Sequence, residues 1–126
     1  KLGQPVRPLG VHSPGHVAET DRQARDEAWE GYRVLRDRIG RERGWGPFSR
    51  AEFEHEVDHG SMYVGSPDTV ARKIAATMRD LGLTRFDMKY SQGTLPHEAL
   101  MRSVTLYGSK VIPMVRQLLG KALAEV

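Results

Sequence analysis

The sequence predicts an α/β fold of about three parallel strands with crossover helices, and this fold is incomplete alone. Three short strand segments, at residues 9–13, 62–64 and 84–90, are separated by segments with helical periodicity. Strands that alternate with helices favour parallel pairing. A typical open sheet has about five or six strands. We therefore interpret the whole chain, residues 1–126, as one partial domain.

The composition is that of a globular protein. Hydrophobic residues make up 39% of the 126 residues and charged residues 28%, which is too apolar for a disordered chain. No apolar run approaches the roughly 20 residues that span a bilayer, and no signal-peptide pattern is present at the amino end. The sequence has no cysteine, which excludes disulfides, thiolate catalysis and cysteine-ligated metals. We expect a cytoplasmic protein that does not bind membranes.

The charge pattern argues against a nucleic-acid-binding protein. The formal net charge is +3 and the pI is about 9.4. Acidic and basic residues interleave, as in residues 21–27 (DRQARDE). A nucleic-acid-binding domain usually gathers Lys and Arg on one face, whereas interleaving is typical of solvated helix faces.

The first strand segment runs into a long helix. We expect the strand to end at Ser13, because Pro14 and Gly15 favour a loop. Thr20 and Gln23 have the spacing of a capping box at a helix start, and Gly40 is the expected helix end. The apolar stripe of this helix consists of Ala24, Ala28, Tyr32, Leu35 and Ile39.

Two further helices are predicted by their end signals. After a loop at residues 41–48, Ser49 and Glu52 form a second capping box, and this short helix carries Phe53 and Val57 and ends at Gly60. After the strand at residues 62–64 and Gly65, the next helix has a capping Ser66, Pro67 in its first turn and Asp68 at its positive end. This helix ends at Gly82, and its predicted buried stripe is Val70, Ile74, Met78 and Leu81.

The last strand and helix complete the pattern. In residues 84–90, apolar and charged residues alternate with a period of two. A loop at residues 91–95 leads to Pro96, which opens the last helix, and Pro113 should kink it because proline lacks the backbone N–H. The predicted inner face of this helix comprises Leu100, Val104, Tyr107, Val111, Val115 and Leu118.

Several stretches, in this order and spacing, resemble one known family. Residues 65–74 (GSPDTVARKI) resemble the strand-to-helix junction near the carboxyl end of luciferase-like monooxygenases, which are flavin-dependent oxidoreductases. Residues 84–90 (TRFDMKY), 93–98 (GTLPHE) and 101–103 (MRS) resemble their last strand and last helix. Residues 13–20 (SPGHVAET) resemble an earlier strand end.

The resemblance covers residues 9–119 and implies the carboxy-terminal part of a (β/α)8 TIM barrel, a fold of about 250 residues when complete. It implies reduced FMN, or a deazaflavin in some members, acting on a small organic substrate, often with oxygen. The partners would be the remainder of the barrel or another copy of the chain in a homo-oligomer, with a flavin reductase. Because a barrel strand is buried on both sides, Asp87 and Lys89 should pair with charges elsewhere in the barrel.

In such barrels the active site lies at the carboxyl ends of the strands. His16 is the candidate catalytic residue, because it is the histidine at a predicted strand end and can transfer a proton. Glycines there permit close approach of a planar ring, and a helix start suits an anion. The same residue types also suit ordinary turns. The candidate cofactor-binding residues are Ser13, Gly15, Gly65, Ser66, Ser91, Gln92 and Gly93.

Two alternatives belong to other functional classes. Residues 55–59 (HEVDH) match the HExxH pattern of zinc hydrolases, in which two histidines one turn apart bind zinc and the glutamate is the general base. Gly60 ends the helix directly after His59, and a catalytic zinc needs a third protein ligand. We therefore predict no metal site. The other alternative is a non-catalytic assembly fragment, because most of the flavin site would lie on strands that this chain does not supply.

Overall fold

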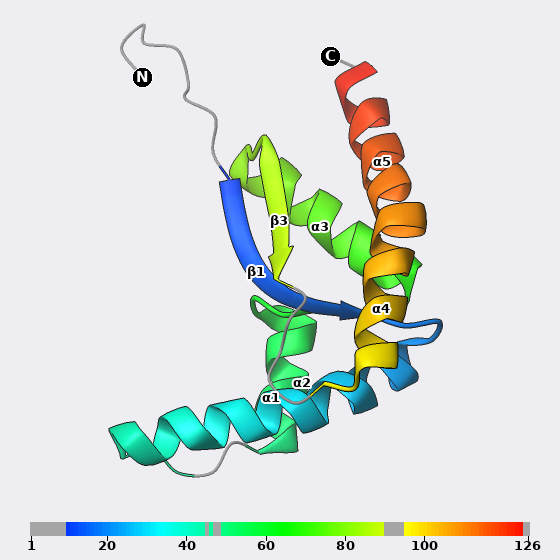
Figure 1. The fold of residues 1–126 in the computed structure, drawn as a ribbon. Helices are drawn as coiled ribbons and strands as arrows, with labels where there is room; N and C mark the ends of the chain where they lie inside the picture. Colours follow the sequence, from blue (N-terminus) through cyan, green and yellow to red (C-terminus); the bar gives the residue numbers. More distant parts are fainter. Residues whose placement is uncertain (1–9, 45, 47–48, 90–94, 125–126) are drawn as a thin grey trace, which may run out of the picture.

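The computed structural model describes residues 10–44, 46, 49–89 and 95–124, which form a small parallel sheet with helices on both faces (Figure 1). The predicted α/β architecture with three parallel strands is confirmed. The elements in chain order are β1 (Gly10–Val17), α1 (Asp21–Arg43), α2 (Arg50–His59), β2 (Tyr63–Gly65), α3 (Pro67–Leu81), β3 (Arg85–Lys89), α4 (His97–Leu106), a π-helical turn (Tyr107–Val111) and α5 (Ile112–Ala124). No helix among the described residues is long and apolar enough to cross a bilayer.

Strand β1 is the centre of the sheet, whose order is β2-β1-β3. Its first half pairs with β3, in a register that runs from Gly10 opposite Arg85 to Pro14 opposite Lys89. Its last three residues pair with β2, so that His16 lies opposite Val64. Each half of β1 therefore has a different neighbour, and the change falls between Pro14 and Gly15.

The prediction that β1 ends at Ser13 was wrong, because the strand continues through Pro14 and Gly15 to Val17. A proline at the point where the pairing partner changes breaks no continuous ladder. Gly15 is required by packing, since a Cβ atom there would lie 2.5 Å from Sδ of Met88 and 2.7 Å from the carbonyl oxygen of Tyr63. The strand is longer than predicted because Pro14 pairs with Lys89 of β3 and Gly15 pairs with Tyr63 of β2.

The helix start signals were predicted correctly. The Thr20 side chain accepts a hydrogen bond from the Gln23 amide at the start of α1, and Ser49 and Glu52 form a complete capping box on α2. Ser66 caps α3, with Pro67 as its first residue. The predicted ends at Gly60 and Gly82 are also confirmed.

The end predicted for α1 was wrong. The helix passes through Gly40, which is buried, and continues to Arg43. Gly44 ends the helix instead, because it adopts the left-handed conformation with φ 74°. A loop was predicted at residues 41–48. Of these, residues 41–43 are helical and Gly44 directly follows the helix.

The buried residues form two clusters, one on each side of the sheet. One cluster joins α1 and α2 to the ends of β1 and β2 and comprises Ala18, Ala24, Ala28, Phe53, Val57, Met62 and Val64. The other lies between the sheet, α3 and α5 and comprises Val17, Tyr63, Val70, Ala71, Ile74, Val111 and Val115. Leu81, predicted to be buried on α3, is 60% exposed because it lies in the last turn, beyond the second cluster.

The last helical segment is interrupted where the sequence predicted an irregularity. The turn before Pro113 is π-helical, and the Ile112 amide bonds the Tyr107 carbonyl five residues earlier. Inserting one residue into the turn rotates α4 relative to α5. The predicted inner face was therefore wrong at Val104, which is exposed, while Ala99 and Ser103 are buried.

Strand β3 differs from a strand buried on both sides. Arg85 and Asp87 are exposed and pair with each other, with Nε and Oδ2 2.9 Å apart. Lys89 is also exposed. Within the described residues Asp87 pairs with Arg85 of the same strand, so its expected pairing with charges elsewhere in the barrel, and that of Lys89, stays a prediction. The loop predicted at residues 91–95 lies, except for Leu95, outside the described residues.

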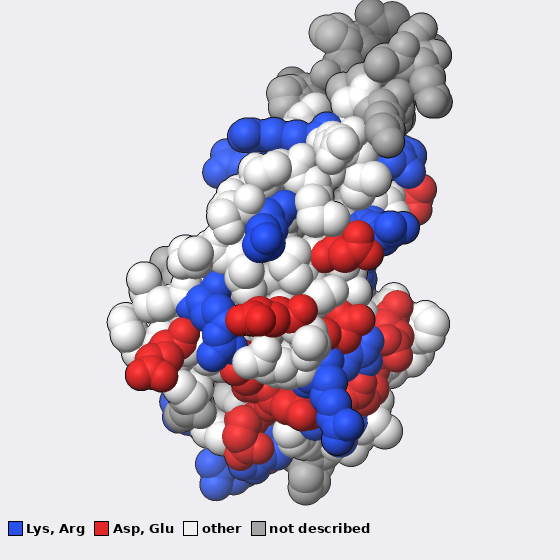
Figure 2. Space-filling model, turned by 90° about the vertical axis from the view of Figure 1, so that its right-hand side faces the viewer, with Lys and Arg blue, Asp and Glu red and all other residues white. Residues whose placement is uncertain are grey.

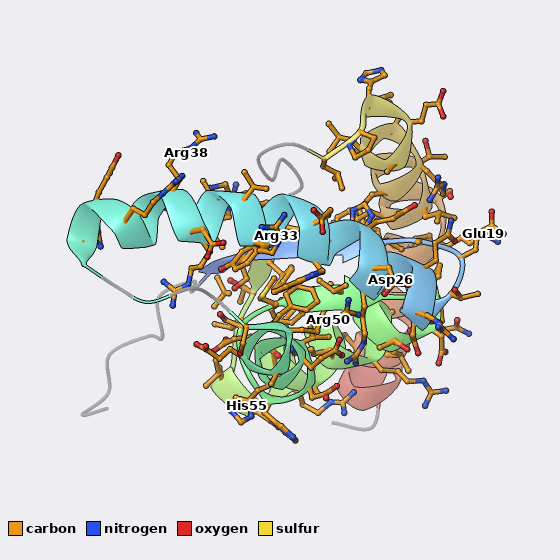
Figure 3. All side chains as sticks on the ribbon, turned by 90° about the horizontal axis from the view of Figure 1, so that it is seen from below. Glu19, Asp26, Arg33, Arg38, Arg50 and His55 are labelled. Atoms are coloured by element: carbon orange, nitrogen blue, oxygen red, sulfur yellow. The ribbon has the colours of Figure 1, made fainter. Side chains whose placement is uncertain are left out.

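The charged surface has the mixed character that the sequence predicted. Arg50 of α2 lies beside Asp26 of α1 and binds it (Figure 3). Arg50 also binds Glu54, and Arg25 of α1 binds Glu54 and Asp58. Figure 2 shows acidic and basic side chains intermingled on the lower part of the face it presents. These ion pairs link α1 to α2 and leave no basic surface there that would favour nucleic acid.

Candidate functional site

The candidate site is centred on His16, whose side chain is fully buried near the end of β1. Its Nε2 atom lies 2.8 Å from Oε1 of Glu27 on α1. The other carboxylate oxygen of Glu27 lies 2.7 Å from Nη1 of Arg102 on α4. One carboxylate therefore joins a strand and two helices.

Helix α4 is fixed beside this site by a second contact. The backbone amide of Val17 donates a hydrogen bond to the buried hydroxyl of Ser103, at 2.9 Å. Ser103 follows Arg102 directly, so the bond to the strand also sets the position from which Arg102 reaches Glu27. The buried Ser103 thus satisfies the amide at the carboxyl end of β1 and orients its neighbour Arg102.

His16 is held as a neutral imidazole. Burial lowers its pKa below the ordinary 6.5, although the hydrogen bond and the charge of Glu27 oppose that shift. Burial raises the pKa of Glu27, but the hydrogen bonds from His16 and Arg102 lower it, and the net direction is down. Glu27 is therefore a carboxylate, which can only accept, so the proton of His16 is assigned to Nε2.

The second ring nitrogen of His16 has no hydrogen-bond partner among the described residues. With the proton on Nε2, this Nδ1 atom is a bare acceptor in a buried environment. A neutral histidine fixed by a carboxylate can accept a hydrogen bond or a proton at its free nitrogen. The proton-transfer role of His16 stays a prediction. The residue lies within β1, one position before its last residue, because the strand continues to Val17.

The structure brings two of the three predicted site stretches together. The end of β1 lies beside Gly65, where the Ala18 amide donates to the Gly65 carbonyl at 3.2 Å. Ser13 is buried and lies further back along β1. The third stretch, containing Ser91, Gln92 and Gly93, lies outside the described residues.

The start of α3 already holds an anion from this chain. Oδ1 of Asp21, the first residue of α1, accepts a hydrogen bond from the Ser66 amide at 2.7 Å. A Cβ atom on Gly65 would lie 2.8 Å from this Asp21 oxygen and 2.9 Å from Cγ2 of Thr69. Burial raises the pKa of Asp21, but hydrogen bonds from Ser66 and Thr69 lower it, and the net direction is down.

The contact between Asp21 and Ser66 occupies the position that a flavin phosphate would take at the start of α3. A phosphate placed at the Ser66 amide would meet the ionised Asp21 carboxylate, so in this arrangement the start of α3 does not fit the phosphate group. Gly15 likewise has a packing reason of its own. The cofactor-binding roles of Ser13, Gly15, Gly65 and Ser66 stay predictions, and no reaction step is assigned to them.

Neither Glu27 nor Arg102 was singled out from the sequence. Glu27 is 11 residues from His16, and Arg102 is 75 residues from Glu27, so no local spacing relates them. The available signal was the stretch at residues 101–103, which was recognised by resemblance only. The link between these residues depends on how α1 and α4 pack around the end of β1.

The HExxH motif does not form a metal site in the described chain. The rings of His55 and His59 lie 5.3 Å apart on α2, as expected for residues one turn apart. The Glu56 carboxylate accepts a hydrogen bond from the Ser61 amide after the helix end. No group of three His, Asp or Glu side chains in the described ranges is placed to hold a metal ion.

Comparison with solved structures identifies proteins of similar fold. The monooxygenase RslO1 from Streptomyces bottropensis is 20% identical, with a TM-score of 0.67 over 87% of this chain and 32% of its own. The oxygenating constituent of 3,6-diketocamphane monooxygenase, a type II Baeyer-Villiger monooxygenase from the CAM plasmid of Pseudomonas putida, is 25% identical. It was solved in complex with FMN, and the TM-score is 0.62 over 84% of this chain and 33% of its own. Apo-MsnO8 is 16% identical, with a TM-score of 0.61 over 87% and 35%.

These similarities show that the chain has the fold of a part of larger proteins, two of which are named as monooxygenases. The chain spans about a third of the length of each of these three proteins. No protein-family model and no curated protein matches the sequence. The fold therefore agrees with a part of a (β/α)8 barrel.

Proposed function

We propose that this chain is part of a flavin-dependent monooxygenase that acts on a small organic substrate with reduced FMN and oxygen. The observation that carries the proposal is the similarity, at 25% identity over 84% of the chain, to an FMN-bound Baeyer-Villiger monooxygenase. FMN is preferred to a deazaflavin because FMN is the cofactor in that neighbour's complex. The 126-residue chain alone is expected to be inactive, because the remainder of the barrel would hold most of the flavin.

His16 is the residue of this chain to which we assign a chemical role. When bound, reduced flavin supplies the two electrons with which oxygen gives one atom to the substrate and one to water. His16 would accept a hydrogen bond or a proton at Nδ1 from a group near the barrel mouth. Glu27 would keep the other nitrogen protonated, and Arg102 would keep Glu27 ionised.

The proposal is tested with a complete barrel that contains this chain. Such a protein should bind reduced FMN, consume oxygen when substrate is added and place an atom from labelled oxygen in the product. A flavin reductase can be replaced in this assay by chemically reduced FMN. Tight binding of a deazaflavin without oxygen uptake would contradict the monooxygenase and support hydride transfer.

A matched pair of variants connects the activity to the site. His16→Gln should reduce turnover by about 100-fold or more, as expected on loss of a general acid or base. His97→Gln changes an exposed histidine in the first turn of α4 and should leave turnover unchanged. Equal activity of both variants would remove His16 from the mechanism while leaving the flavin assignment intact.

A further inference from the structure

Helix α4 packs against the carboxyl end of β1, close to the buried His16. The arrowhead of β1 ends beside α4 in Figure 1, and the Val17 amide donates a hydrogen bond to the Ser103 hydroxyl of that helix at 2.9 Å. The His16 side chain is fully buried, and its Nδ1 atom has no partner among the described residues. An element next to this strand end must therefore move before a reactant can meet Nδ1.

Of the elements around His16, α4 has the weakest attachment to the buried core. Helix α1 and strand β2 both contribute buried side chains to the first cluster. Neither cluster has a buried member from α4 in the described part of the chain, although Leu106 in its last turn packs against the second cluster. The start of α4 has no side-chain cap, and its buried residues are Ala99 and Ser103. The hydrogen bonds of Ser103 and Arg102 are therefore its main polar attachments.

The π-helical turn between α4 and α5 has the properties of a hinge. Such turns are rare and occur frequently at functional sites. A Cβ atom on Gly108, within the turn, would meet nothing within 4 Å, so packing does not require a glycine there. Glycine makes a helix easier to open because it has the greatest backbone freedom. Helix α5 is anchored beyond the turn, since Val115 belongs to the second buried cluster.

We infer that α4 is a gate, which swings about the π-helical turn and gives a reactant access to His16. Opening breaks the bond between Val17 and Ser103 and releases Arg102 from Glu27. The bond between His16 and Glu27 stays in place, because both residues lie outside α4, and the imidazole keeps its orientation. The gate rests on the proposed role of His16, and its contacts lie within this chain, so they do not depend on strands that the chain lacks.

Chemical modification of His16 tests the gate without flavin or substrate. Diethyl pyrocarbonate acylates the bare nitrogen of a neutral imidazole, and peptide mass spectrometry gives the rate at His16 beside the exposed His12 and His97. At low urea His16 should react slowly, at a rate nearly independent of urea, because a local opening exposes little surface. A reaction that occurs only as global unfolding sets in, with the same urea dependence, would overturn the gate.

A serine variant tests the bond that closes the gate. Ser103→Ala removes the acceptor of the Val17 amide and should raise the urea-independent rate at His16 by about 10-fold, the effect of one lost hydrogen bond. Ser61→Ala, at an exposed position after α2, is the control and should leave the rate unchanged. Circular dichroism shows whether each variant is folded. Equal rates in these two folded variants would show that the bond does not close the gate.

Two glycine variants test the hinge. Gly108→Ala should slow the reaction at His16 by about 5-fold, because alanine favours the helical state over an opened one. Gly120→Ala in α5 is the matched control, since a Cβ atom there also meets nothing within 4 Å, and it should leave the rate unchanged. Equal rates in both variants would overturn the hinge at the π-helical turn. A complete barrel that shows the gate but takes up no oxygen would contradict the monooxygenase alone.

Discussion

Nε2 of His16 and Oε1 of Glu27 lie 2.8 Å apart, and this contact joins the central strand to the helix that follows it. The histidine is fully buried, whereas the Glu27 side chain is 22% exposed. Burial disfavours the charged form of an imidazole, so protonation of His16 at low pH opposes the folded state.

Acidification should destabilise the protein through His16. Burial lowers its pKa below 6.5, so just below that pH the unfolded chain binds a proton that the folded chain does not. This contribution to stability is full above about pH 6.5 and is lost as the pH falls toward the lowered folded pKa. Urea unfolding between about pH 7.5 and about pH 5.5 should show the decrease. His16→Gln should flatten it, and an unchanged slope in that variant would contradict the assignment.

Glu27→Gln should lower the unfolding free energy by about 1–3 kcal/mol. The two carboxylate oxygens accept from His16 and Arg102, whereas glutamine offers a single, neutral acceptor oxygen. The matched control is Glu30→Gln on the same helix. Glu30 is 67% exposed and pairs with Arg33, so the expected change is within about 0.5 kcal/mol. Chemical denaturation measures both values. A loss for Glu27→Gln no larger than that of the control would show that the carboxylate bridge does not stabilise the fold.

Gly15→Ala should be destabilising by about 1–3 kcal/mol, because the added methyl group has no room between β2 and β3. One of the two close atoms is the backbone oxygen of Tyr63, which cannot move without disturbing β2. Gly46→Ala is the control, since nothing lies within 4 Å of a Cβ atom there. Thermal unfolding of the two variants should separate them clearly. Equal melting temperatures would mean that β1 can shift to accept the side chain.

Asp21→Ala should expose the start of α3 to external anions. The Ser66 amide loses its carboxylate partner, and we expect a loss of about 1 kcal/mol, similar to the loss of a helix cap. Inorganic phosphate should then raise the melting temperature of the variant more than that of the native chain, because helix starts bind anions. Asp80→Ala, at an exposed position near the end of α3, should show no such gain. An identical response of all three proteins would show that Asp21 does not block an anion site.

The helix starts could be predicted because their signals are local. Ser49 and Glu52 lie three residues apart and satisfy each other's backbone groups, so the sequence contains the whole interaction. The end of α1 was misplaced because Gly40 and Gly44 are equally plausible from composition. The choice depends on which glycine can adopt the left-handed conformation while the other packs inside the fold.

The candidate site was predicted only in part, since its central contacts are distant in sequence. His16 was found from its expected place at a strand end, but Glu27 and Arg102 were not, because packing of α1 and α4 brings them together. Pro14 and Gly15 were read as a turn because those residue types favour turns. In the structure they mark the point where β1 changes partners, which only the sheet as a whole determines.

The bond between the Val17 amide and the Ser103 hydroxyl has a consequence for the order of folding. These residues are 86 positions apart, so the carboxyl end of β1 has β2 on one side and a helix from the last quarter of the chain on the other. During synthesis this amide must stay bound to water until α4 has left the ribosome. The end of the first strand, with His16 beside it, is therefore among the last parts of the chain to become fully bonded.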